Sequence, residues 1–143
     1  MAHREYGCAV LVDTQGRLLL QRRDDIPGIL YPGLIGLFGG HREEGETLLA
    51  CAVREITEEI GLPVAAERFE LLLRFRGADM DIPGGTATGD CFLVTGLDVA
   101  RITVTEGSLH IATVEDIPRV AHEMVASALL AVRTYIDRLR PPS

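Results

Sequence analysis

The sequence has no long hydrophobic run, and its first residues lead us to expect no secretion leader. Across its 143 residues, no apolar segment approaches the roughly 18 to 20 residues needed to cross a bilayer. The start, MAHREYGCAV, leads within a few residues into the polar stretch Asp13-Thr14-Gln15-Gly16, so it lacks the uninterrupted apolar core of a signal peptide. We therefore expect a soluble cytoplasmic protein that has no membrane partner.

Cysteine and basic charge are also scarce. Cys8, Cys51 and Cys91 are odd in number and widely spaced in apolar surroundings, which fits neither a disulfide framework nor a CxxC metal site. We interpret them as reduced packing residues. The net charge of −7 repels nucleic-acid polymers, and Arg22-Arg23 is the only adjacent basic pair in a region expected to face a ligand. A phosphorylated substrate would therefore need a cation to bridge it to the protein.

The length predicts one domain over residues 1–143, enough for a single hydrophobic core but short for two. Apolar segments at Tyr6–Val12 and Arg17–Arg22 flank a turn-forming cluster and predict a hairpin. Further strands are expected near Ile35–Phe38, Phe69–Phe75, Cys91–Thr95 and His110–Val114. The glycine- and aspartate-rich stretch Gly77–Asp90 is expected to be a loop.

Two segments have the apolar spacing of helices. Between Thr47 and Ile60 apolar residues recur at helical intervals, Thr47 can cap the start, and Gly61 can end the run. A second pattern runs from Pro118 to Leu139 and predicts one closing helix. Strands outnumber helices, and the helices are far apart in sequence. We therefore predict an α+β fold, a mixed β-sheet flanked by helices in an α/β/α sandwich.

The first predicted helix carries a row of carboxylates beside its apolar face. Glu55, Glu58 and Glu59 stand at i, i+3 and i+4, where like charges destabilise an isolated helix by a few tenths of a kcal/mol per pair. A solvated charged face would have the same pattern. A cluster of oxygen-only ligands, however, suits a hard divalent cation such as Mg²⁺. The preceding Gly39-Gly40 has no side chains, so a main-chain carbonyl there can approach the same cation.

The same segment matches a known family pattern at every specified position. From Gly40 the chain has five residues, then Glu46, then seven residues, then REITEEIGL from Arg54 to Leu62. This resembles the Nudix hydrolase signature G-x5-E-x7-R-E-U-x-E-E-x-G-U, where U is a bulky aliphatic residue. The predicted hairpin, strands and closing helix follow the family's order over nearly the whole chain, so the resemblance also implies the Nudix α/β/α sandwich.

The resemblance implies a pyrophosphohydrolase that uses Mg²⁺ or Mn²⁺. It would cleave the pyrophosphate link of a small nucleoside diphosphate derivative, of the nucleoside triphosphate or nucleotide sugar type. The implied metal ligands are the carbonyl of Gly39 and the carboxylates of Glu55, Glu58, Glu59 and Glu106. Glu106 lies outside the signature, in a loop before a strand, and the other candidates for this ligand are Asp98, Glu115 and Asp116.

The resemblance also assigns roles around the metal. The implied catalytic residues are Arg54, Glu55 and Glu58. Glu55 would be either a ligand or the base that takes a proton from water, and both roles stay open. Arg54 would pair with a neighbouring glutamate, and Glu46 would reach the metal directly or through water, which orients the ligands. A homodimer also stays open.

Substrate contacts are expected from the loop QRRDDIPGILYPG between Gln21 and Gly33. Arg22 or Arg23 could bind phosphate oxygens in a bidentate manner, although a surface basic pair at a strand end would look the same. Tyr31 could stack on a base or sugar, or could pack its ring and hydrogen-bond its hydroxyl. The alternative function is a non-catalytic Nudix-like module that senses a nucleotide metabolite, and the intact set of glutamates argues against it.

Overall fold

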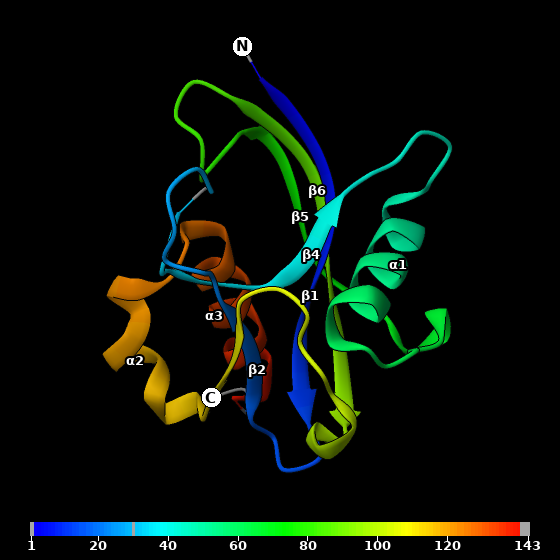
Figure 1. The fold of residues 1–143 in the computed structure, drawn as a ribbon, viewed down its shortest axis with the longest axis vertical. Coiled ribbons are helices and arrows are strands. Elements are labelled where there is room, and N and C mark those ends of the chain that lie inside the picture. The colour runs from blue at the N-terminus through cyan, green and yellow to red at the C-terminus, as the bar shows by residue number, and fades with distance from the viewer. Residues whose placement is uncertain (1, 30, 141–143) are drawn as a thin grey trace.

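The computed structural model describes residues 2–29 and 31–140, and its centre is a seven-stranded mixed sheet (Figure 1). The strands are β1 (His3–Asp13), β2 (Leu18–Arg22), β3 (Ile35–Gly36), β4 (Phe38–His41), β5 (Glu70–Ala78), β6 (Thr86–Leu97) and β7 (Ser108–Ala112). Their order is β3-β2-β1-β6-β5, with β4 paired to β1 and β7 paired to β2. The predicted hairpin of β1 and β2 is confirmed, with Leu11 opposite Leu19.

The central strand β1 changes partner along one of its edges. It runs parallel to β6 on one side. On the other side, Tyr6–Ala9 pair with β4, and Leu11 and Val12 pair with β2. The sheet therefore divides beside the first half of β1.

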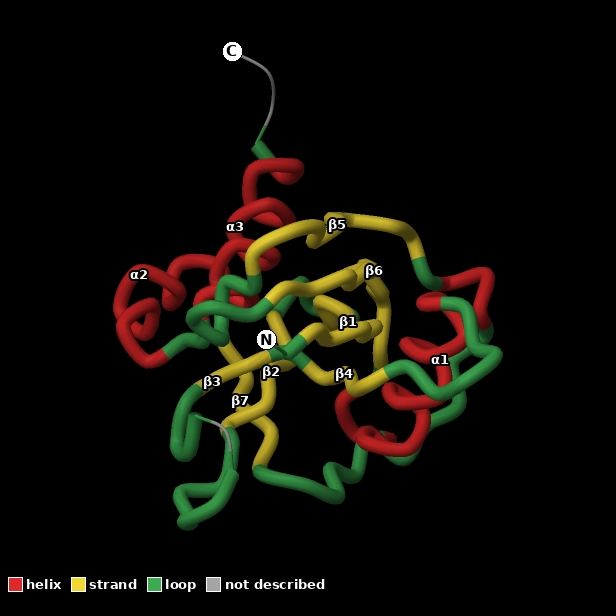
Figure 2. The backbone as a smooth tube through the Cα atoms, turned by 90° about the horizontal axis from the view of Figure 1, so that it is seen from above, coloured by secondary structure: helices red, strands yellow, loops and turns green. Residues whose placement is uncertain are grey.

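Helices cover both faces of the sheet, as the view from above shows (Figure 2). They are α1 (Leu48–Ile60), α2 (Ile117–Val120) and α3 (Ala126–Leu139), with short 3-10 turns η1 (Ala66–Arg68), η2 (Val99–Arg101), η3 (Val114–Asp116) and η4 (Ala121–Glu123). Because side chains alternate along a strand, Ala9 and Leu11 pack on the α1 side and Val10 and Val12 on the α3 side. The predicted α+β sandwich is confirmed.

Helix α1 begins and ends where its sequence predicts. The Thr47 side chain accepts a hydrogen bond from Ala50 N, and Gly61 closes the helix in a left-handed conformation with φ 63°. The helix packs tightly on β1, because a Cβ on Gly7 would lie 2.5 Å from the Leu48 carbonyl oxygen. The three cysteines are free in the structure, and Cys51 is buried within α1.

The closing helix is not continuous, contrary to the sequence prediction. Two short turns, α2 and η4, come first, and the chain then becomes extended at Val125, with φ −62° and ψ 139°. There Val125 N donates to the carbonyl oxygen of Ile35 at 2.9 Å, so the segment extends the edge of β3 before α3 begins. An apolar spacing cannot reveal this break, because both segments bury the same kind of side chain.

The strand β6 begins at Thr86, within the stretch predicted to be a loop. It pairs with β1 from His3 onward, and Gly89 lies inside it opposite Tyr6. A Cβ on Gly89 would lie 2.4 Å from the Tyr6 ring, so this glycine makes room for an aromatic side chain. No helix in residues 2–29 and 31–140 is long and apolar enough to cross a membrane.

Candidate active site

A cavity of about 640 Å³ lies beside the first half of β1, where the sheet divides. Residues from β1, β4, α1, the β5–β6 loop and the start of α3 line it, and we call it the β1–β4 cavity. Its volume is within the range of small-molecule sites. Glu55 and Glu59 of α1 line it together with Glu106, which precedes β7.

The paired glycines of β4 let these carboxylates into the cavity. A Cβ on Gly40 would lie 2.3 Å from the carboxyl carbon of Glu55, so the carboxylate occupies the space that any side chain there would fill. A Cβ on Gly39 would lie 2.4 Å from the Gly7 carbonyl oxygen, so this glycine lets β4 approach β1. Gly39 N also donates to Glu59 Oε1 at 3.3 Å. The double glycine is therefore a steric requirement of the site.

Glu59 is a buried acid among other acids. It is 7% exposed, and within the described chain no basic side chain forms an ion pair with it. Its pKa is raised to about 8, first by burial and then by the charge of Glu55, while the hydrogen bond from Gly39 N–H acts in the opposite direction. Gln21 Nε2 lies 3.5 Å from Glu59 Oε2 and donates to the Glu106 carbonyl oxygen at 3.0 Å. This environment favours binding of a positive charge.

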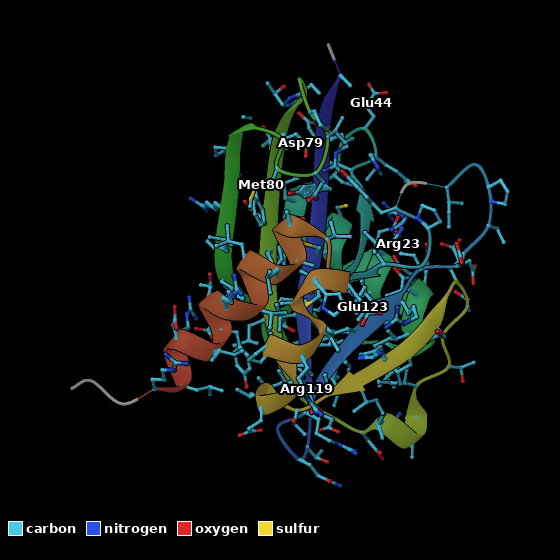
Figure 3. All side chains as sticks on the ribbon, turned by 90° about the vertical axis from the view of Figure 1, so that its left-hand side faces the viewer. Arg23, Glu44, Asp79, Met80, Arg119 and Glu123 are labelled. Atoms are coloured by element: carbon cyan, nitrogen blue, oxygen red, sulfur yellow. The ribbon has the colours of Figure 1, made fainter. Side chains whose placement is uncertain are left out.

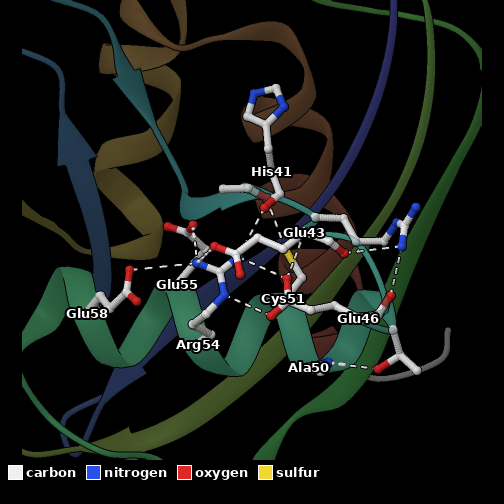
Figure 4. Close-up of polar contacts among 11 residues, drawn as sticks. His41, Glu43, Glu46, Ala50, Cys51, Arg54, Glu55 and Glu58 are labelled. Carbon is white, nitrogen blue, oxygen red and sulfur yellow. Dashed lines mark hydrogen bonds and ion pairs between the residues drawn. The ribbon is translucent and has the colours of Figure 1, made fainter.

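Arg54 holds the glutamates on the outer side of α1 (Figure 4). Its Nε and Nη2 donate to both carboxylate oxygens of Glu46, at 2.8 and 3.0 Å, and its Nη1 donates to Glu55 Oε1 at 2.8 Å. The hydrogen bonds from Arg54 lower the pKa of Glu46 to about 2. Arg54 therefore ties the loop before α1 to Glu55 and restricts the rotation of the Glu55 carboxylate.

The predicted site residues divide between the cavity and its surroundings. Those that line the cavity are Gly39, Glu55, Glu59, Glu106, Arg23 and Tyr31. The Glu58 side chain is 62% exposed and lies 3.7 Å from Arg54 Nη1, outside the lining. Arg22 is also not part of the cavity lining. Its Nη1 donates instead to the Gly33 carbonyl oxygen at 2.8 Å and to Glu123 at 3.2 Å.

The described residues do not contain three or more acidic, histidine or cysteine side chains already arranged to hold a metal ion. Glu55 is engaged by Arg54, and the exposed Glu58 side chain is not part of the cavity lining. A cation shared by all the predicted ligands would therefore require rotation of these side chains.

The lining also includes residues that the sequence does not identify, among them Arg4, Tyr6, Asp81 and Ser127. Arg4, Tyr6 and Cys8 alternate along β1, so all three can face the cavity. A predicted strand that began at His3 instead of Tyr6 would place Arg4 on the same face as Tyr6 and Cys8 and so identify it as a candidate site residue. Asp81 and Ser127 are brought to the cavity only by the tertiary fold.

The fold and this site define a Nudix-type α/β/α protein with a glutamate-bearing helix behind paired glycines. The chain belongs to the Nudix family, because residues 1–93 match the NUDIX domain model. A stretch of 70 residues is 39% identical to dihydroneopterin triphosphate diphosphatase of Escherichia coli (strain K12). That match covers 49% of this chain and 43% of that protein, so it spans less than half the length of the relative.

Solved structures share the fold over nearly the whole chain. The MutT protein of Methanosarcina mazei Go1 superposes with a TM-score of 0.79 at 15% identity, covering 98% of this chain and 97% of that one. The NUDIX domain of Shewanella oneidensis NrtR, solved in complex with ADP ribose, has a TM-score of 0.77 at 19% identity, covering 98% and 90%. At these identities the similarity establishes the fold alone.

Proposed function

We propose that this chain is a divalent-cation-dependent pyrophosphohydrolase that acts on a small nucleoside triphosphate-type compound. The observation that carries the proposal is the buried carboxylate of Glu59, which lies beside Glu55 and the paired glycines in a cavity of ligand size. A buried acid without a basic partner is costly in a folded protein, and a cation would offset that cost.

The donor set fits Mg²⁺ or Mn²⁺. The candidate ligands of the proposal are the Glu55 and Glu59 carboxylates, the Gly39 carbonyl and the Glu106 carboxylate, all of which are oxygen donors on residues that line the cavity. When bound, such a cation neutralises charge on phosphate oxygens and activates water. Arg54 would keep Glu55 oriented through the Nη1 hydrogen bond. Glu58 would join after a rotation of its side chain.

The triphosphate type of substrate is favoured over the nucleotide sugar type. The support is the 39% identity, over 70 residues, to a protein named for the hydrolysis of dihydroneopterin triphosphate. Within the cavity, Arg23 is the predicted contact for phosphate oxygens, and Tyr31 is the predicted contact for a ring. The alternative function is a non-catalytic module that binds a nucleotide metabolite, and ADP ribose is a compound to test for it because the NUDIX domain of NrtR, which shares the fold, was solved with that ligand.

Activity on a substrate panel tests the proposal. The protein, with Mg²⁺, is incubated with nucleoside triphosphates, dihydroneopterin triphosphate, a nucleotide sugar and ADP ribose, and the released pyrophosphate or phosphate is measured. We expect turnover of at least one triphosphate and none in excess chelator. Binding of ADP ribose without turnover of any compound would favour the sensor instead, and turnover in chelator would contradict cation dependence.

Cation binding can also be measured without catalysis. We expect Mg²⁺ to raise the melting temperature, because a ligand that binds only the folded state adds about 2.7 kcal/mol at roughly 100 times its dissociation constant. Differential scanning calorimetry of the wild type and of Glu59→Gln makes the comparison. The variant should lose most of the Mg²⁺-dependent rise, and an equal rise in both proteins would place the cation elsewhere.

A further inference from the structure

The β1–β4 cavity has a second polar group, which is separate from Glu55 and Glu59 and is centred on Arg4. Arg4 lies four residues before Cys8, and Cys8 is opposite Gly39 in the pairing of β1 with β4. Four residues of strand span about 13 Å. Arg4 therefore belongs to the end of the cavity that lies along β1 away from Gly39.

The Arg4 guanidinium is held in a fixed orientation. Its Nε and Nη2 donate to the two carboxylate oxygens of Asp79 at 2.7 and 2.9 Å, and Nη2 also lies 3.4 Å from Asp81 Oδ2. The guanidinium carbon is 5.0 Å from the centre of the Tyr6 ring, a cation–π contact. Within residues 2–29 and 31–140, its Nη1 has no hydrogen-bond partner. Arg4 thus offers a donor of fixed position.

Asp81 is a fixed acceptor beside this donor. Its side chain is 7% exposed, and it lines the cavity. Ser127 N donates to Asp81 Oδ1 at 3.0 Å, and Ser127 Oγ donates to Oδ2 at 2.5 Å, which ties the β5–β6 loop to the start of α3. A carboxylate oxygen can accept two hydrogen bonds, so Oδ1 keeps room for one more. Figure 3 shows the neighbouring Asp79 on this loop, near the N-terminal part of β1.

The charges at this end of the cavity disfavour phosphate. One positive guanidinium faces two carboxylates, Asp79 and Asp81, so the group as a whole is negative. A phosphate would be repelled, whereas N–H groups of a neutral ring would be attracted. The lining of the cavity also includes the aromatic and apolar side chains of Tyr6, Leu37, Val125 and Ala128, which suit a flat ring.

We propose that Arg4 and Asp81 form a recognition subsite for a 2-amino-4-oxo heterocycle, the ring edge shared by guanine and pterins. The ring oxygen accepts from Arg4 Nη1, and one of the two adjacent donors, the ring N–H or the amino group, donates to the remaining acceptor position of Asp81 Oδ1. Adenine has an amino group where guanine has the ring oxygen, and an unprotonated ring nitrogen where guanine has the N–H. In the same position, that amino group would face Arg4 and the bare nitrogen would face the Asp81 carboxylate. This proposal rests on the proposed function and specifies the substrate class of the same cavity.

The expected discrimination is large. A site built to hydrogen-bond one ring edge leaves its buried groups without partners when the edge is wrong, and such sites can discriminate by 10⁴ or more. We expect kcat/KM for GTP and for dihydroneopterin triphosphate to exceed that for ATP at least about 100-fold. ITP, which has the oxo and N–H groups but lacks the amino group, should lie between GTP and ATP. Comparing kcat/KM for GTP with kcat/KM for dihydroneopterin triphosphate shows which of the two rings is preferred.

Variants of the two residues provide the decisive comparison. Asp81→Asn should lower kcat/KM for GTP at least about tenfold and should raise rather than lower that for ATP, since the bare ring nitrogen of adenine no longer faces a carboxylate. Asp137→Asn, the same chemical change on the exposed side of α3, is the matched control and should alter neither. Arg4→Lys keeps the charge but loses the planar guanidinium, and it should also reduce the preference for GTP. It serves as the second test if Asp81→Asn does not fold.

Binding separates this proposal from the proposed function. Isothermal titration calorimetry of GMP and AMP needs no turnover, and GMP should bind at least about tenfold more tightly to the wild type. If no triphosphate is hydrolysed but GMP is still preferred, the hydrolase proposal fails and the subsite stands. Equal kcat/KM for GTP and ATP, or an equal loss for both in Asp81→Asn, would overturn the subsite.

Discussion

Replacing Glu59 by glutamine is expected to lower kcat at least about 100-fold without unfolding the protein. Mutation of groups that merely support metal ligands typically costs 10- to 100-fold, and a buried ligand should cost at least as much as the upper end of that range. Glu59 is 7% exposed and faces the cavity beside Glu55, so its charge cannot be replaced by another acid without rearrangement. Steady-state kinetics on the best substrate of the panel measures the loss.

The fold should survive this change, because glutamine has nearly the same shape and, like the protonated acid that a pKa of about 8 favours at neutral pH, is uncharged. Melting in chelator should therefore give a temperature equal to or above that of the wild type. Glu67→Gln, the same change on exposed η1, is the control and should leave kcat unaltered. A Glu59→Gln protein with kcat within about threefold of the wild type would remove Glu59 from the mechanism.

Gly40→Ala is expected to lower kcat about 100-fold and to leave the fold nearly intact. The new Cβ would lie 2.3 Å from the Glu55 carboxyl carbon, which is the end of a flexible side chain and can move aside. Displacing a catalytic group by about 1 Å can cost about 100-fold in rate. Kinetics and thermal melting of the same preparation separate the two effects.

The neighbouring substitution Gly39→Ala should have the opposite balance. Its Cβ would lie 2.4 Å from the Gly7 carbonyl oxygen and 2.6 Å from Cys8 Cα, and these backbone atoms cannot move without separating β4 from β1. Overpacking of this kind typically costs 1 to 3 kcal/mol, about 2 to 10 °C in melting temperature. For Gly40→Ala, a stable protein with full activity would contradict the prediction, because it would show that catalysis does not require the present position of the Glu55 carboxylate.

Local signals predicted much of the fold. The apolar spacing of α1, its Thr47 cap and its Gly61 end are properties of neighbouring residues, and the structure has all three. The hairpin of β1 and β2 likewise depends on one short turn. The break at Val125 depends on a hydrogen bond to Ile35, 90 residues earlier in the chain, and no local pattern contains that information.

The same division applies to the candidate site. The signature identified Glu55, Glu59 and the paired glycines because the spacing of a helix and its preceding loop is a local property. Glu58 and Arg22 are in the expected segments, but their side chains point to solvent or to other loops in this structure. Rotamers depend on neighbours in space, so the sequence could not predict them.

The sequence by itself determined the family, the helix that carries the carboxylates and the need for glycine beside it. Each of these depends on residues close together in the chain, where spacing and steric size are sufficient. Only the tertiary structure decided which carboxylate is buried and what lies at the far end of the cavity. Arg4, Asp81 and Ser127 come from three distant segments, and they meet because β1, the β5–β6 loop and α3 pack against one core.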